Sequence, residues 1–174
     1  MGKPAPPLIG VTAPLGGDLP VGGVLVLESV CFSYRDQDAP AVNDVSLSLA
    51  AGETAAVMGP SGCGKSTLLY LAAGLLRPDR GVISVGGAEI TSLGLEGRAE
   101  VRRTSLGIVF QFGELVAELS LRDNVALAAE LSGLRRHQAL ARSGELLERV
   151  GLSDLCDRYP AQVSGGEGQR CAVA

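Results

Sequence analysis

Tryptophan is absent from this 174-residue sequence, and aromatic residues make up only 3% of it. A core without large rings has to be built from alanine, valine and leucine side chains. Hydrophobic residues account for 46% of the chain, an ordinary share for a globular protein. At this length, that content predicts one domain with a buried core rather than two domains.

Long runs of charge of one sign are also absent, and the net charge is −4. Proteins that bind nucleic acids neutralise phosphate groups with clustered lysine and arginine side chains. The charge distribution therefore argues against a nucleic-acid partner.

The four cysteines lie far apart, and no Cys-x-x-Cys pair occurs. This spacing argues against a disulfide or zinc framework and is typical of a protein in a reducing cytosol. We expect Cys31, Cys156 and Cys171 to be small core residues. The single histidine, His137, falls in a polar helical stretch, where we expect it to be solvated.

Long hydrophobic runs are missing as well, since no stretch reaches the roughly 18 apolar residues that a membrane-spanning helix needs. Residues 1–22 are rich in proline and glycine and lack periodicity, which predicts a flexible leader. Lys3 is not followed by the apolar segment of a signal peptide, because prolines interrupt this region. If the protein works at a membrane, we expect a partner to hold it there.

The remaining chain alternates strand-like and helix-like patterns, which indicates an α/β protein. The run 54–58 is short, apolar and close to glycines, as expected of a strand buried on both faces in a parallel sheet. The predicted strands cover residues 24–34, 45–49, 54–58, 82–85 and 106–110. The predicted helices cover residues 66–76, 121–131 and 136–150.

Residues 59–67 match the pattern G-x-x-x-x-G-K-[ST] in full. Glycines let the backbone curl so that successive N–H groups form an anion-binding nest, and the following helix adds its positive end. Lys65 supplies a mobile charge for the β and γ phosphates, and Ser66 offers a hydroxyl to Mg²⁺. The predicted nucleotide-binding residues of this loop are Gly59, Ser61, Gly62, Cys63, Gly64, Lys65, Ser66 and Thr67.

A glycine-rich turn that matches by chance is the alternative, but a predicted buried strand precedes the motif and a predicted helix follows it. The motif therefore predicts a nucleoside-triphosphate site, and it leaves open the superfamily and the choice between ATP and GTP. Cys63 lies in the loop at a helix N-terminus, where a thiolate is favoured. We expect this thiol to be sensitive to alkylation and shielded by ATP.

Three further segments, taken together, resemble the ABC transporter ATPases. The run 163–170, Val-Ser-Gly-Gly-Glu-Gly-Gln-Arg, resembles the ABC signature and lies about 100 residues after Lys65. Gln111 resembles the Q-loop glutamine, and Tyr34 resembles the aromatic that stacks on adenine. Alone, each has a plain alternative as a loop turn, an ordinary glutamine or a strand aromatic. Their order and spacing make the resemblance specific.

The resemblance covers residues 24–174 and implies a P-loop core of ABC type. It also implies an antiparallel β region at the start, a helical subdomain at about 115–162, and a partial ATP-binding domain over 23–174. The run 107–125 is similar to the ATPases of lipoprotein release, macrolide export, antimicrobial-peptide export and cell division.

The resemblance further implies a head-to-tail dimer that closes on ATP and Mg²⁺. Gln111 would sense Mg²⁺ and the γ-phosphate, and the 112–118 loop would touch a membrane permease. The subunit would be cytoplasmic and peripheral on the inner face of the cell membrane. The signature residues that would face the nucleotide of the opposing subunit are Ser164, Gly165, Gly166 and Glu167.

The sequence stops inside the signature helix, before the Walker B strand, its Asp and Glu, and the switch histidine of the family. No earlier apolar strand ends in Asp-Glu. We therefore expect a fragment or truncated reading frame, very slow hydrolysis, and an unpaired, aggregation-prone edge at residues 54–58. We also expect the isolated chain to be unstable or partly molten. Gly168 departs from the glutamine usual in the subgroup, which weakens the first turn of this helix.

The leading hypothesis is the nucleotide-binding subunit of an ABC exporter or release system. One alternative is an ABC-type ATPase without a membrane partner, and another is a non-catalytic module that only binds nucleotide. The transported substrate is selected in the permease and cannot be read from this chain.

Overall fold

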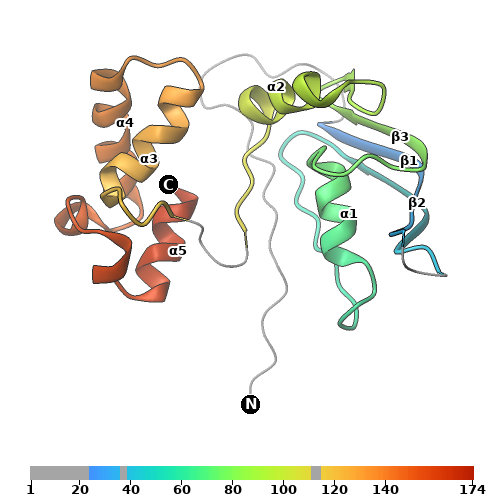
Figure 1. The fold of residues 1–174 in the computed structure, drawn as a ribbon, viewed down its shortest axis with the longest axis horizontal. Coiled ribbons are helices and arrows are strands. Elements are labelled where there is room, and N and C mark those ends of the chain that lie inside the picture. The colour runs from blue at the N-terminus through green and yellow to red at the C-terminus, as the bar shows by residue number, and fades with distance from the viewer. Residues whose placement is uncertain (1–23, 36–38, 111–114) are drawn as a thin grey trace. The chain divides into compact units, whose positions relative to one another are not determined.

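The computed structural model describes residues 24–35, 39–110 and 115–174. The chain divides into two compact units, Met1–Ile108 and Val109–Ala174, which are described separately (Figure 1). None of the helices in the described ranges is long and apolar enough to cross a membrane. The predicted leader, residues 1–22, lies outside the described residues.

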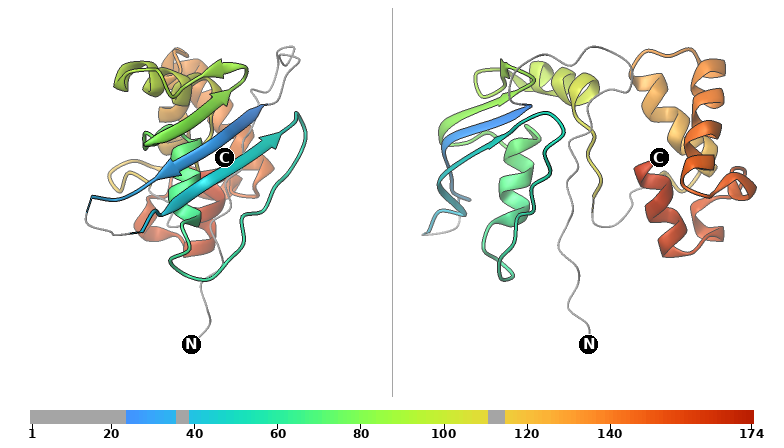
Figure 2. Two further views of the ribbon diagram at one scale, coloured as in Figure 1. Left: turned by 90° about the vertical axis from the view of Figure 1, so that its right-hand side faces the viewer. Right: turned by 180° about the vertical axis from the view of Figure 1, so that it is seen from behind.

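The first unit contains a four-stranded antiparallel sheet with the strand order β2-β1-β3-β4 (Figure 2). Leu27 in the central strand pairs with Leu47 on one side and Ile83 on the other, so apolar side chains form a row across the sheet. This sheet confirms the predicted antiparallel region at the start of the domain. The strands are β1 (Leu25–Phe32), β2 (Val42–Leu49), β3 (Arg80–Val85) and β4 (Ala88–Glu89).

Helix α1 (Lys65–Ala72) packs on one face of this sheet (Figure 2). Its Leu71 is completely buried and joins Leu27 and Ile83 in one hydrophobic core. The helix is shorter than the predicted 66–76, because Gly74 takes a left-handed conformation just after it (φ +66°).

Sequence patterning missed helix α2 (Leu95–Ser105), because five of its 11 residues are charged and its few apolar residues do not mark out a helical face. Val101 packs against the core of the unit, and polar contacts hold the rest of the helix. Arg102 Nη1 donates to the carbonyl of Gly74 at 2.9 Å, and Arg103 pairs with Glu100 one turn earlier. Arg98 is different, because it is buried and its Nε and Nη1 have no hydrogen-bond partner among the described residues.

Replacing Arg98 by methionine is expected to stabilise the protein. A buried donor without an acceptor costs about 1–3 kcal/mol, and a methionine of similar length removes that cost while it fills the same space. We expect the free energy of unfolding in urea to rise by about 1–3 kcal/mol. Arg103→Met is the matched control on the same helix and should change stability little, because Arg103 pairs at the surface. A destabilised Arg98→Met protein would show that the guanidinium has a partner in solution.

Two predicted strands are wrong, because residues 54–58 and 106–110 form no strand. A strand needs a neighbour to pair its backbone groups, and neither segment pairs with any strand of the described sheet. Most of the 54–58 run is exposed, and the side chain of Met58 is 82% exposed. An apolar pattern alone does not supply the neighbouring strand that a sheet needs.

The second unit is helical, and its principal helices follow the predicted bounds closely. Its core combines residues from all three helices and the turns between them. The elements are α3 (Leu121–Leu131), α4 (Arg136–Arg149), α5 (Gly165–Val173) and two short 3-10 turns at Ser153–Leu155 and Pro160–Gln162. The buried residues of the core are Leu121, Val125, Leu147, Leu152, Cys156 and Cys171.

Candidate functional site

The glycine-rich loop enters helix α1 through backbone conformations that require glycine. Gly62 and Gly64 both lie in the left-handed region, with φ of +82° and +88°. A Cβ on Gly64 would lie 2.0 Å from the carbonyl oxygen of Ala41, so a side chain cannot be accommodated there without movement. Gly64 is also the N-cap of α1 and supplies no side chain to its first turn. Among the described residues no side chain caps this positive end of the helix, where an acceptor from outside would be favoured.

Lys65 folds back onto the loop. Its Nζ donates to the carbonyl oxygens of Gly59 at 2.9 Å and Pro60 at 2.6 Å, and it lies 3.7 Å from Cys63 Sγ. These partners are neutral groups of a largely exposed loop. A phosphate oxygen would offer the ammonium group a charged partner, and charge-assisted hydrogen bonds are the stronger ones. The loop is therefore built so that an anion can replace its internal acceptors.

The structure places all the predicted residues of this motif in one loop and helix turn. The exposed members include Cys63 and Ser66, whereas Thr67 is buried. Tyr34, from the segment after β1, reaches the same place, because its hydroxyl lies 3.2 Å from Thr67 Oγ1. Its ring stands edge-on to Phe32 at 5.0 Å and remains 39% exposed. The Tyr34 side chain is thus partly accessible beside the loop.

Cys63 should react with iodoacetamide at pH 8 much faster than the three buried cysteines. Burial raises the pKa of the Cys171 thiol to about 11, so this thiol stays protonated and unreactive until the pH approaches that value. Cys31 and Cys156 are protected by burial alone. We expect MgATP to slow the labelling of Cys63, measured by mass spectrometry of the intact chain and its peptides. Equal Cys63 labelling rates with and without MgATP would show that the nucleotide does not cover this thiol.

The signature turn begins helix α5 with a reciprocal cap. The backbone N–H and the hydroxyl of Ser164 donate to Glu167 Oε2 at 2.7 and 2.8 Å, and the Glu167 N–H donates back to Ser164 Oγ at 3.3 Å. The donated bonds lower the pKa of the Glu167 carboxyl. The Ser-x-x-Glu spacing is a capping-box pattern that could have been read from the sequence. Gly168 lies inside the helix, so the first turn forms despite the glycine.

Gln111 and residues 112–114 lie outside the described residues. The loop of residues 59–67 belongs to the first unit and the Ser164 turn to the second. Within the described ranges, no three His, Cys, Asp or Glu side chains gather as a metal site. Sequence reasoning also missed Asn124, whose hydrogen bonds hold the chain before α3.

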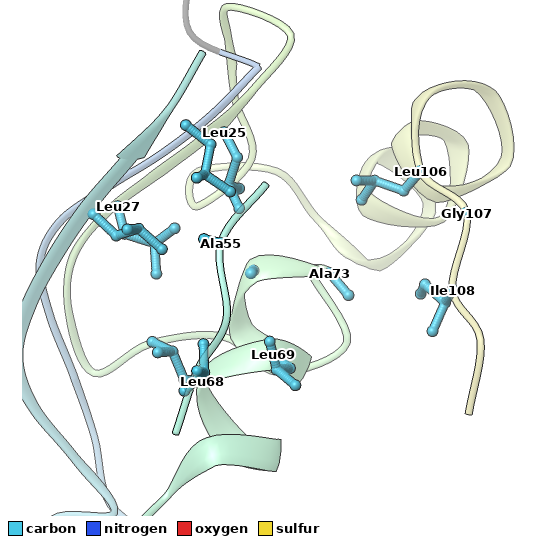
Figure 3. A pocket seen from close by; sticks show the side chains of 13 residues that line it. Leu25, Leu27, Ala55, Leu68, Leu69, Ala73, Leu106, Gly107 and Ile108 are labelled. Atoms are coloured by element: carbon cyan, nitrogen blue, oxygen red, sulfur yellow. The ribbon is translucent and has the colours of Figure 1, made fainter. Parts of the chain in front are cut away.

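A hollow in the first unit lies between the sheet, helix α1 and the 106–108 segment, and Ala55 also lines it (Figure 3). Its lining is almost wholly aliphatic, including Leu27 and Leu68. Such a surface offers no donors to a triphosphate, so the hollow is not part of the loop site.

The comparisons with known proteins point in one direction. A family model described as "ABC transporter" matches residues 42–174. The lipoprotein-releasing system ATP-binding protein LolD 2 of Caulobacter vibrioides is 40% identical over 153 residues, covering 87% of this chain and 67% of that protein. The methionine import ATP-binding protein MetN of the same organism is 41% identical over 151 residues, covering 87% of this chain and 45% of that protein.

Among solved structures, a dimeric post-hydrolysis state of the ATP-binding cassette MJ0796 bound to ADP and Pi superimposes with a TM-score of 0.79. It is 29% identical, and the match covers 86% of this chain and 67% of that one. A lipoprotein-release protein is among the relatives, as the run 107–125 predicted, and a methionine-import protein matches at the same level. Sequence identity therefore does not separate release from import. The chain belongs to the ABC transporter family, of which it carries an ATP-binding domain.

Proposed function

We propose that the chain binds MgATP at residues 59–67 and works as half of a head-to-tail dimer in which ATP joins two copies. This proposal rests on the first turn of α1, which no side chain among the residues seen in the structure caps. Beside this turn, the Lys65 ammonium group donates to neutral carbonyl oxygens. A related cassette solved as a dimer with ADP and Pi supports the nucleotide and the assembly.

The residues around the loop fit a magnesium–nucleotide complex. Ser66 is exposed in the first turn of α1, and a hydroxyl is a hard oxygen ligand of the kind Mg²⁺ prefers. Gln111 is the second proposed ligand. When bound, the ion neutralises part of the phosphate charge, and Lys65 neutralises another part. Tyr34 would then offer its exposed ring to the base, from a position fixed by the contact with Thr67.

The Ser164 turn is the proposed contact to the nucleotide of the opposing copy. It presents the N–H groups of Gly165 and Gly166 at the start of α5, together with a hydroxyl. In the structure, the Ser164 hydroxyl donates to the Glu167 carboxylate. Donation to a γ-phosphate therefore requires this hydroxyl to rotate away from the carboxylate, whereas the two glycine amides need no such exchange.

The wider role is transport, in which closure of two ATP-binding domains would move a separate membrane permease. We place the domain on the cytoplasmic face of the membrane, bound to that permease, and we leave the substrate to the permease. ATP hydrolysis belongs to the proposal for the whole protein, because the chain spans 67% of the LolD 2 protein and 45% of the MetN protein named above.

Equilibrium titration of the chain with MgATP, with light scattering on the same samples, tests this proposal. MgATP binding together with a doubling of the molecular mass supports both the nucleotide site and the dimer. Binding without dimer formation would remove the dimer and leave the loop site standing. No binding by folded protein would remove the proposal altogether.

A further inference from the structure

The side chain of Asn124, in the first turn of α3, holds the chain segment that leads into the helix. Its Nδ2 lies 3.1, 3.1 and 2.9 Å from the carbonyl oxygens of Val116, Leu119 and Ser120. Its Oδ1 accepts the N–H of Val116 at 2.7 Å. One amide therefore fixes both ends of the 116–120 loop. Alanine offers no such groups, and an ionised aspartate can only accept.

The side chains of residues 116–118 face solvent although the backbone of the 116–120 loop is fixed. Ala117 and Glu118 are exposed, and Val116 is 41% exposed. The loop thus combines a defined backbone with free side chains. A partner that contacts these side chains would push on a rigid element rather than on a flexible one.

The start of α3 is also bonded to the segment that precedes the signature turn. The N–H of Leu121 donates to the carbonyl of Arg158 at 2.8 Å, and the N–H of Arg122 donates to that of Cys156 at 2.9 Å. From helix α5, Cys171 Sγ lies 3.7 Å from the carbonyl of Leu121. Two adjacent residues of α3 therefore tie together three parts of the second unit.

Close packing completes the connection between the loop and helix α5. Leu121 is completely buried in the same core as Cys171 of α5. At the other end, Leu115 Cδ1 would be 4.0 Å from a Cβ on Gly168, so the residue just before the loop lies directly beside α5. Well-packed interiors of this kind transmit displacement instead of absorbing it.

We propose that Asn124 is a positioning residue that makes the 116–120 loop and the Ser164 turn move as one piece. The mechanical link stands on the contacts of the second unit alone. Its use rests on the proposed function: a membrane partner that displaces the exposed loop would shift Ser164 relative to the nucleotide of the opposing copy. Without the Asn124 bonds, the loop would lose its fixed backbone, and the turn would lose the support that the loop gives it.

Amide hydrogen exchange on the whole chain, compared between wild type and Asn124→Ala, tests the link. The reporters are the amides of Val116 and Leu119 in the loop and those of Glu167 and Gly168 in the turn, all of which are hydrogen-bonded. We expect exchange at both places to rise by about tenfold or more, the factor for one lost hydrogen bond. Ser132→Ala is the matched control, because it removes a hydroxyl bond at the other end of α3 and should change neither place.

Leu147→Ala provides a control for simple loss of stability, because Leu147 is completely buried in the same core but contacts neither reporter by hydrogen bonds. It should raise exchange throughout the second unit. Faster exchange in the loop alone in Asn124→Ala would overturn the proposal, and so would an identical pattern in Leu147→Ala at equal stability.

Wild-type protein gives a second measurement that needs no variant to fold. In increasing urea, the loop and turn reporters should open at the same denaturant concentration, and separate openings or a lack of protection at either place would overturn the link. Titration of the same samples with MgATP distinguishes failure of the proposed function from failure of the link between the loop and the turn. A chain that fails to bind MgATP but shows coupled exchange loses the proposed function and retains the link.

Discussion

Lys65→Ala is expected to weaken MgATP binding by about 10- to 150-fold while the protein stays folded. Hydrogen bonds from a charged donor contribute about 1.5–3 kcal/mol, and each 1.4 kcal/mol changes a dissociation constant tenfold. Among the described residues, the Lys65 ammonium group contacts only two carbonyl oxygens and a thiol, all in a largely exposed loop. Removing it therefore takes away little native stability and most of the charge that a triphosphate would meet.

Calorimetric titration with MgATP measures this loss, and salt provides an independent check. Wild-type affinity should fall more steeply with ionic strength than that of Lys65→Ala, because one charge pair is missing in the variant. Lys65→Arg is the matched control: it retains the charge in a wider, planar group, so we expect an affinity between the other two. Equal affinity of wild type and Lys65→Ala would mean that the loop does not hold the phosphates.

Features fixed by local chemistry could be predicted from the sequence. The loop at 59–67 can be predicted because its motif fixes the positions of the glycines. The structure shows why glycine is needed there, since Gly62 and Gly64 both take a positive φ. Helix α3 has the predicted bounds, and the structure shows local signals at both ends: Ser120 caps its start, and Gly133 takes a left-handed conformation just after its end.

Features that depend on distant partners could not be predicted. Residues 54–58 have the composition of a buried strand, but a strand is defined by the backbone that pairs with it. Helix α2 carries no apolar period and is recognised only from its contacts, such as that of Arg102 with Gly74. The role of Asn124 was invisible because all its partners are backbone groups, which no sequence pattern records.

Gly64→Ala should abolish detectable MgATP binding and destabilise the protein more than Gly62→Ala. Both glycines are left-handed, and an alanine in that conformation costs about 1–2 kcal/mol. Only at Gly64 would the new Cβ also meet backbone, 2.0 Å from the carbonyl oxygen of Ala41. At Gly62 nothing lies within 4 Å. The two substitutions therefore share their conformational cost and differ in the clash.

The loop, rather than Ala41, has to yield to that clash. The N–H of Ala41 donates to the carbonyl of Phe32 at 2.9 Å, and the next residue begins strand β2, so the oxygen is held by the sheet. Moving Gly64 turns the first amides of α1 away from the position where phosphates would bind. Urea unfolding followed by circular dichroism, with MgATP titration of both variants, separates the two contributions. If Gly62→Ala and Gly64→Ala lose the same stability and the same affinity, the approach of the loop to Ala41 does not exist in solution, and the anion site would have to be explained without it.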